Sequence, residues 1–206
     1  LLGNNRVRRL ASLFLPNGFA VAIAACLSLF FIADVLQLES YSGIFLAIYF
    51  VSGACSLPMW LILSRRLGKA LTWALGTLAA VAGFFWAIQL GVGDLVPYVI
   101  ICLLSGAALG ADLALPAAIA ADIIPHRDRG RAASYFGIWS LINKAVLALS
   151  AGLGLPLLAG FGYKPGGEAG LAELAVFYAG VPCVIKLLSA ALLFRWRPSL
   201  EMKHAV

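Results

Sequence analysis

Six long runs of apolar residues, separated by short polar or glycine-rich breaks, make up almost the whole chain. The runs cover residues 10–35, 42–63, 71–90, 96–121, 133–158 and 174–194. Each matches or exceeds the roughly 20 residues that a helix needs to cross a bilayer core of about 30 Å. The pattern predicts an all-α, polytopic membrane protein in which six transmembrane helices form one bundle over residues 1–206.

The composition supports this assignment. Hydrophobic residues make up 63% of the chain, charged residues make up 12%, and the mean hydropathy is +0.98. A soluble domain of 206 residues could not bury this much apolar surface in one core. The net charge of +6 comes from short basic clusters between apolar runs and not from one exposed face, so no nucleic-acid partner is expected.

The distribution of basic residues predicts the orientation in the bilayer. The N-terminus, the second and fourth loops and the C-terminal tail together hold twelve of the fifteen Lys and Arg residues. Six crossings place these four segments on the same side of the membrane. By the positive-inside rule both termini are cytoplasmic, and we expect the protein in the plasma (inner) membrane.

Cysteines and histidines give no indication of a cofactor. The cysteines lie singly in apolar runs, without CxxC spacing, at Cys26, Cys55, Cys102 and Cys183. The two histidines have no carboxylate or cysteine cluster at ligand spacing, so we expect no metal site and no disulfide. No nucleophile motif, phosphate-binding loop or paired carboxylates are present, so we expect no enzymatic activity.

Three charged residues lie near the middle of the apolar runs. Asp112, Lys144 and Lys186 all fall roughly at mid-bilayer when counted at about 1.5 Å per helical residue. Such groups usually face a packed or water-filled interior and serve transport or ion pairing. We expect Asp112 to pair with Lys144 across neighbouring helices, with Lys186 as the alternative partner.

The helix carrying Lys144 has a stripe of small, partly polar residues. The stripe comprises Gly137, Ser140, Lys144, Ala148 and Ala151. It fits the wall of a transport pathway, with Asn143 beside it, and it equally fits close packing of two helices. In the fourth run, Gly106 and Gly110 at four-residue spacing also predict the close approach of another helix.

A basic turn follows the fourth apolar run. Asp122 precedes Arg127, Arg129 and Arg131, so an ion pair at the helix end is possible. Such a pair would act as a cytoplasmic gate that opens in one conformation. The alternative is an ordinary solvated surface charge.

Several short motifs resemble those of the glycoside-pentoside-hexuronide:cation symporters, the melibiose-permease-like branch of the major facilitator superfamily. The motifs are Ser56-Leu57-Pro58-Met59-Trp60, Arg65-Arg66-Leu67-Gly68-Lys69, Ala120-Ala121-Asp122, Arg129 to Trp139, Asn143-Lys144, Leu155-Pro156-Leu157-Leu158 and Gly162 to Gly166. The resemblance covers nearly the whole chain. Two departures occur just after Asp122, where Pro125 and His126 replace a second acidic residue and a tyrosine that the family often has.

The resemblance implies twelve helices in two six-helix halves that move a sugar or related small solute by alternating access, coupled to Na⁺ or H⁺. This chain resembles the C-terminal half, and Lys144 matches the family's eleventh-helix lysine, close to the cation and sugar sites. The family's cation-binding acids lie mostly in the N-terminal half. The chain begins at Leu1, without an initiator Met or a signal peptide, so we expect a fragment that needs that other half as a partner.

We therefore predict a secondary active transporter whose partners are a small-molecule solute, a coupling cation and the lipid bilayer. The solute is a sugar or another small organic molecule. The alternative function is a membrane sensor or assembly subunit that has the same fold but does not transport.

Overall fold

The structure is a computed structural model that describes residues 5–123, 132–167 and 169–200. Within these ranges the chain forms helices and turns without any strand, which confirms the all-α prediction. Six helical stretches are long and apolar enough to span a membrane, as predicted. They are Val7–Val35, Glu39–Leu67, Lys69–Gln89, Leu95–Asp122, Ser140–Gly160 and Leu171–Pro198.

Two of the six spans contain a π-helical turn near the same end of the bundle. The first span consists of α1 (Asn5–Phe30) and the π turn η1 (Phe31–Val35). The last consists of α6 (Leu171–Ala175), the π turn η5 (Val176–Gly180) and α7 (Val181–Leu200). The other spans are formed by η2 (Glu39–Tyr41) with α2 (Ser42–Leu67), α3 (Lys69–Phe84) with η3 (Phe85–Gln89), α4 (Leu95–Ile123) and α5 (Ala132–Gly160).

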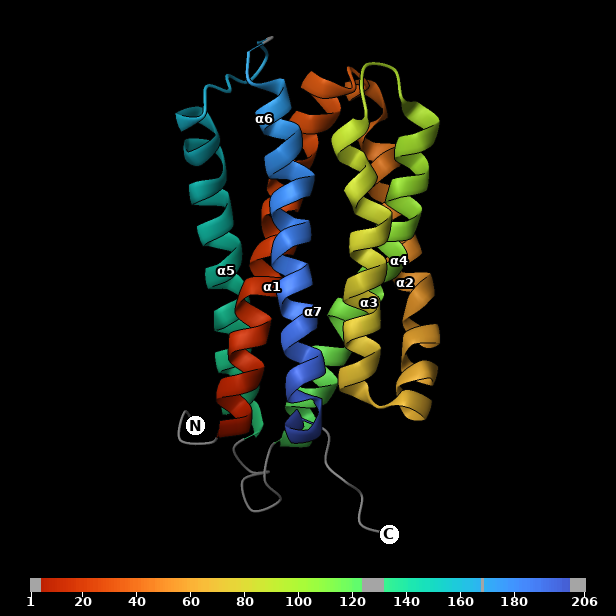
Figure 1. The fold of residues 1–206 in the computed structure, drawn as a ribbon, viewed down its shortest axis with the longest axis vertical. Coiled ribbons are helices and arrows are strands. Elements are labelled where there is room, and N and C mark those ends of the chain that lie inside the picture. Colours follow the sequence, from red (N-terminus) through yellow and green to blue (C-terminus); the bar gives the residue numbers. More distant parts are fainter. Residues whose placement is uncertain (1–4, 124–131, 168, 201–206) are drawn as a thin grey trace.

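The spans alternate in direction, so α1 begins and α7 ends at the lower end of the bundle in Figure 1. The main packing contacts join the helices in the order α5, α1, α7, α3, α4 and α2. Helices α5 and α2 therefore lie at opposite edges (Figure 1). Only 22% of the apolar stretch of α5 and 17% of that of α2 is buried, against at least 44% for the other spans. These two helices keep apolar faces that the described part of the chain does not cover.

Small residues set the separation of α2 and α4, as the glycine spacing predicts. A Cβ atom at Gly106 would strike the backbone carbonyl of Tyr49, and one at Gly110 would strike Ser56 Oγ. Ser56 Oγ donates a hydrogen bond to the Ala107 carbonyl oxygen at 2.7 Å. Larger residues at either glycine would force the two backbones apart.

At the upper end, the loop between α5 and α6 is fastened to the end of the first span. The Tyr163 hydroxyl donates a hydrogen bond to the Asp34 carboxylate, and the Gly166 N–H donates to Asp34 Oδ2 at 3.1 Å. Tyr163 is only 1% exposed, although it lies in a loop. Burial and, to a lesser extent, the hydrogen bond and charge of Asp34 raise the pKa of the Tyr163 phenol.

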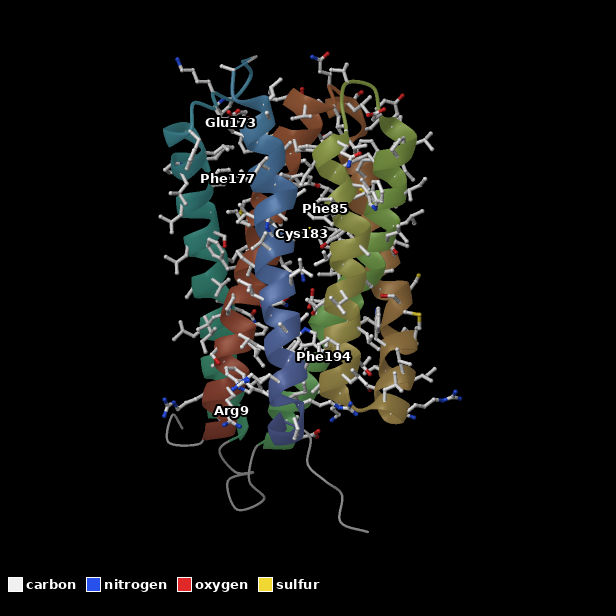
Figure 2. The ribbon with its side chains drawn as sticks, in the orientation of Figure 1. Arg9, Phe85, Glu173, Phe177, Cys183 and Phe194 are labelled. Atoms are coloured by element: carbon white, nitrogen blue, oxygen red, sulfur yellow. The ribbon has the colours of Figure 1, made fainter. Side chains whose placement is uncertain are left out.

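Charged side chains mark the two ends of the bundle, with an apolar band between them. Figure 2 shows Arg9 at the lower end and Glu173 at the upper end, with Phe177, Cys183 and Phe194 spaced along the last span between them. This distribution fits an integral membrane protein whose ends contact the polar headgroup regions.

Candidate functional site

The two charges that meet inside the bundle are Asp112 of α4 and Lys186 of α7. Lys186 Nζ lies 2.6 Å from Asp112 Oδ2, and the two side chains are only 10% and 6% exposed, in that order. The expected pairing of Asp112 with Lys144 is therefore wrong, and Lys186, the alternative partner, takes that position. The two side chains satisfy each other at a depth where either charge alone would be costly.

An asparagine on α1 joins both members of this pair. Asn17 Nδ2 donates to Asp112 Oδ1 at 2.9 Å, and Asn17 Oδ1 accepts from Lys186 Nζ at 3.1 Å. Asn17 is 2% exposed and follows Pro16 within the helix. A single amide thus donates a hydrogen bond to the carboxylate of Asp112 and accepts one from the ammonium group of Lys186.

A tryptophan on α3 completes the set of polar contacts. Trp73 Nε1 donates to Asp112 Oδ1 at 2.9 Å, and the residue is completely buried. The carboxylate of Asp112 thus accepts three hydrogen bonds, one each from α1, α3 and α7. We call Asn17, Trp73, Asp112 and Lys186 the central polar cluster, because it connects four of the six spans.

Two members of this cluster were not predicted from the sequence. Asn17 lies within an apolar run, where an amide is an unusual residue that needs a partner, and this signal could have identified it. Trp73 lies near the start of α3, where a tryptophan is typical of the membrane interface, but its indole N–H reaches inward to Asp112. The contacts of Asn17 and Trp73 depend on which helices are neighbours. The spacing of residues along one helix does not determine which helices pack together.

A cavity of about 310 Å³ lies between α1, α2, α4 and the last span. Asp112 and Lys186 are the lining residues furthest along α4 and α7, so the ion pair forms its lower end. Cys183, another lining residue, lies partway along the last span, between Phe177 and Phe194 (Figure 2). The cavity thus lies along the inner sides of these helices and opens beside the exposed lining residues Leu29 and Phe50, with its charged end near mid-span.

Aromatic rings surround the upper end of this cavity. The Tyr98 and Tyr178 hydroxyls share a hydrogen bond of 2.8 Å, and the Tyr178 ring stacks on Phe31 with ring centroids 4.3 Å apart. Phe45 meets Tyr98 edge to face at 4.8 Å. Since Phe31 and Tyr178 both belong to π turns, the two irregular segments pack on each other above the cavity.

The predicted residues on α5 lie away from the central polar cluster. Ser140, Asn143 and Lys144 are exposed, on the helix that packs mainly on α1 at one edge of the bundle. Within the described ranges, Lys144 forms no ion pair. These three polar side chains face outward from this bundle at membrane depth.

Asp122, the predicted gate residue, is paired with a different residue from those expected. Lys69 Nζ lies 2.6 Å from Asp122 Oδ2 and 3.2 Å from the Ala118 carbonyl oxygen. This contact joins the beginning of α3 to the end of α4. The other expected gate residues, Arg127, Arg129 and Arg131, lie outside the described residues.

Across the described ranges, no three His, Cys, Asp or Glu side chains lie close enough together to hold a metal ion. The polar chemistry of the interior is thus that of an ion pair with amide and indole donors. Such a cluster can hold helices together, and it can bind a solute that enters the cavity.

A family model described as MFS/sugar transport protein matches residues 1–198. No curated protein and no solved structure matches the chain. The family match covers nearly all of the chain, and the six-helix bundle is the fold expected for one half of such a transporter. The chain therefore belongs to the MFS/sugar transport protein family of membrane transporters.

Proposed function

We propose that the chain is the C-terminal half of a cation-coupled symporter of the melibiose-permease-like branch, which moves a sugar or related small organic solute by alternating access. The observation that carries this proposal is the Asp112–Lys186 ion pair at the end of a cavity between the helices. Ionisable groups inside membrane spans are rare, and they commonly mark solute and ion pathways.

The outward-facing side of α5 supports the need for a second half. A charged Lys144 facing lipid at mid-span would cost about 2.5 to 3.5 kcal/mol. Ser140 and Asn143 lie on the same exposed helix, and their polar groups also need partners away from lipid. We therefore place the N-terminal six-helix half against α5 and α2, where it would cover these residues and complete the pathway. Its acidic residues would hold the coupling cation, Na⁺ or H⁺, near Lys144.

The lower end of the bundle would act as the cytoplasmic gate, with both termini in the cytoplasm. The Lys69–Asp122 pair is partly exposed, with side chains 34% and 41% accessible. Exposed pairs of this kind form and break at little free-energy cost. Arg127, Arg129 and Arg131 would compete with Lys69 for Asp122 as the two halves rock.

Counterflow in proteoliposomes tests this function. The full-length protein would be reconstituted, loaded with an unlabelled sugar and exposed to the same sugar in labelled form, with and without a Na⁺ or a pH gradient. We expect solute-specific counterflow and accumulation driven by one of the two gradients. Counterflow without any response to either gradient would reject cation coupling but would still support solute transport.

The same preparation distinguishes the alternative, a membrane sensor or assembly subunit. Such a protein would show no counterflow with any of the sugars tested. If a solute nevertheless raised the unfolding temperature of the protein, the cavity would be a sensing site and the transport proposal would be wrong.

A further inference from the structure

The wall of the central cavity is apolar over most of its surface. Above the ion pair, α1 contributes small aliphatic residues such as Ala20 and Ala24, and α2 and α4 contribute aromatic rings, including Phe45 and Tyr98. A solute in this cavity would contact mainly carbon atoms on the sides that these helices cover. Burial of apolar solute surface is therefore the main source of binding free energy that this wall offers.

Four polar side chains of the upper wall are already hydrogen-bonded within the protein. Ser28 Oγ donates to the Ala25 carbonyl, and Ser105 Oγ donates to the Ile101 carbonyl. The Tyr98 and Tyr178 hydroxyls bond to each other. Apart from the Tyr49 phenol, which also lines the cavity, this wall offers few unused donors or acceptors. A solute with hydroxyl groups on every side would therefore lose water there without gaining equivalent partners.

The lower end of the cavity has capacity for one polar group. An ammonium group has three N–H donors, and Lys186 uses two of them, on Asp112 and Asn17. The remaining donor and the Asp112 carboxylate lie at the cavity wall. Because the two charges cancel, a charged ligand at this end would add an uncompensated charge to the apolar interior.

We propose that this cavity binds an uncharged amphipathic solute, with an apolar or aromatic body along the upper wall and a single hydroxyl-bearing end at Asp112 and Lys186. This inference rests on the proposed function, because it defines the solute class of the same pathway. A free sugar, hydroxylated all round, fits the wall less well than a compound that presents an apolar group to it.

A matched set of probes tests the solute class on the purified full-length protein in lipid nanodiscs, by equilibrium binding. The probes are methyl and phenyl β-D-glucoside, the corresponding galactosides, and phenyl β-D-glucuronide, which carries a negative charge. We expect the phenyl glycoside to bind about tenfold or more tightly than the methyl glycoside in at least one sugar series. The glucuronide should bind about tenfold or more weakly than phenyl β-D-glucoside.

A cavity variant and its control locate the binding. Ala24 lines the cavity, whereas Ala79 is exposed on α3 away from it. Ala24→Leu should remove most of the preference for the phenyl group, and Ala79→Leu should leave that preference unchanged. As a second measurement, the phenyl glycoside should slow alkylation of Cys183 in the cavity at least about threefold relative to exposed Cys55.

The outcomes separate this inference from the proposed function, because binding in nanodiscs does not require transport. Equal affinity for methyl and phenyl glycosides, or no binding of any probe, would overturn the inference even if free sugars show counterflow. An unchanged phenyl preference in Ala24→Leu, together with unprotected Cys183, would overturn it as well. The protein could also bind the phenyl glycoside selectively, lose that preference in Ala24→Leu, and show no counterflow. That result would support the inference and reject the proposed transport function.

Discussion

Lys186 and Asp112 lie 74 positions apart in the sequence, and their charged atoms meet at 2.6 Å inside the bundle. Each is buried, and each also bonds to Asn17, so the pair is held from a third helix. Removing one charge would strand the other in a low-dielectric interior. The pair therefore links the stability of the bundle to the chemistry of its cavity.

A double-mutant cycle tests this coupling. Asp112→Asn and Lys186→Gln should each lower the free energy of unfolding by about 3 to 5 kcal/mol, because each leaves a buried charge unpaired. The double variant should lose clearly less than the sum of the two. Thermal unfolding of the purified protein in detergent provides the comparison.

Lys144 supplies the control for that cycle. Because Lys144 is exposed on α5, away from the central polar cluster, Asp112→Asn and Lys144→Gln should be additive to within about 0.5 kcal/mol. Additive losses for Asp112 and Lys186 would contradict the ion pair. Non-additive losses for Asp112 and Lys144 would show instead that the two residues interact.

The close packing of α2 and α4 predicts opposite effects for two glycine substitutions. In Gly106→Ala, the new methyl group would strike the Tyr49 backbone, which cannot rotate away. The expected loss is about 1 to 3 kcal/mol. Gly152 on α5 is exposed, and a Cβ atom there would meet no neighbour within 4 Å, so Gly152→Ala should be neutral or stabilise by up to about 1 kcal/mol. Equal unfolding temperatures for the two variants would argue against this helix contact.

The hydrogen bond from Tyr163 to Asp34, which holds the loop between α5 and α6, predicts a loss of stability at alkaline pH. Burial and the Asp34 carboxylate raise the pKa of the Tyr163 phenol above its value of about 10 in an unfolded chain. The stability that the protonated phenol contributes is complete below pH 10 and is lost as the pH rises through the folded-state pKa. Tyr163→Phe should cost about 1.5 to 3 kcal/mol at neutral pH, because the bond to a charged acceptor is lost.

Unfolding temperatures measured between pH 7 and pH 11 check this prediction. Tyr163→Phe should lose less stability than the wild type across the alkaline part of that range. Tyr41→Phe, at an exposed phenol, is the matched control and should retain the wild-type alkaline loss. Parallel curves for Tyr163→Phe and the wild type would show that the Tyr163 phenol does not control this transition.

The number and type of the membrane spans could be predicted from the sequence, because lipid imposes a length and an apolar composition on each crossing. Counting residues along each span also places Asp112, Lys144 and Lys186 at similar depths. Depth alone does not fix the direction in which a side chain points around its helix axis. Choosing Lys186 over Lys144 required knowing that α7 packs between α1 and α3, whereas α5 packs on α1 at one edge of the bundle.

Other features depend on tertiary packing in the same way. The π turns η1 and η5 bring Phe31 and Tyr178 into contact, and no periodicity in either apolar run marks them. Tyr163 lies in a glycine-rich loop, where its composition predicts exposure, and the bond to Asp34 instead holds it buried. Long-range polar contacts thus determine which loop and helix residues turn inward.

The separation of Lys144 from the ion pair predicts that the two lysines have different roles. Lys186→Gln should reduce both stability and uptake, since it breaks the central polar cluster. Lys144→Gln should destabilise the protein less, because Lys144 has no ion-pair partner among the described residues. The same variant should nevertheless reduce gradient-driven uptake about tenfold or more, because in the proposed transporter Lys144 faces the other half and the coupling cation. Lys144→Arg keeps the charge and tests whether charge alone suffices. Thermal unfolding and uptake would be measured on the same preparations of the full-length protein. Wild-type uptake by Lys144→Gln would mean that this side chain contacts lipid and extends its ammonium group to the interface, outside the transport pathway.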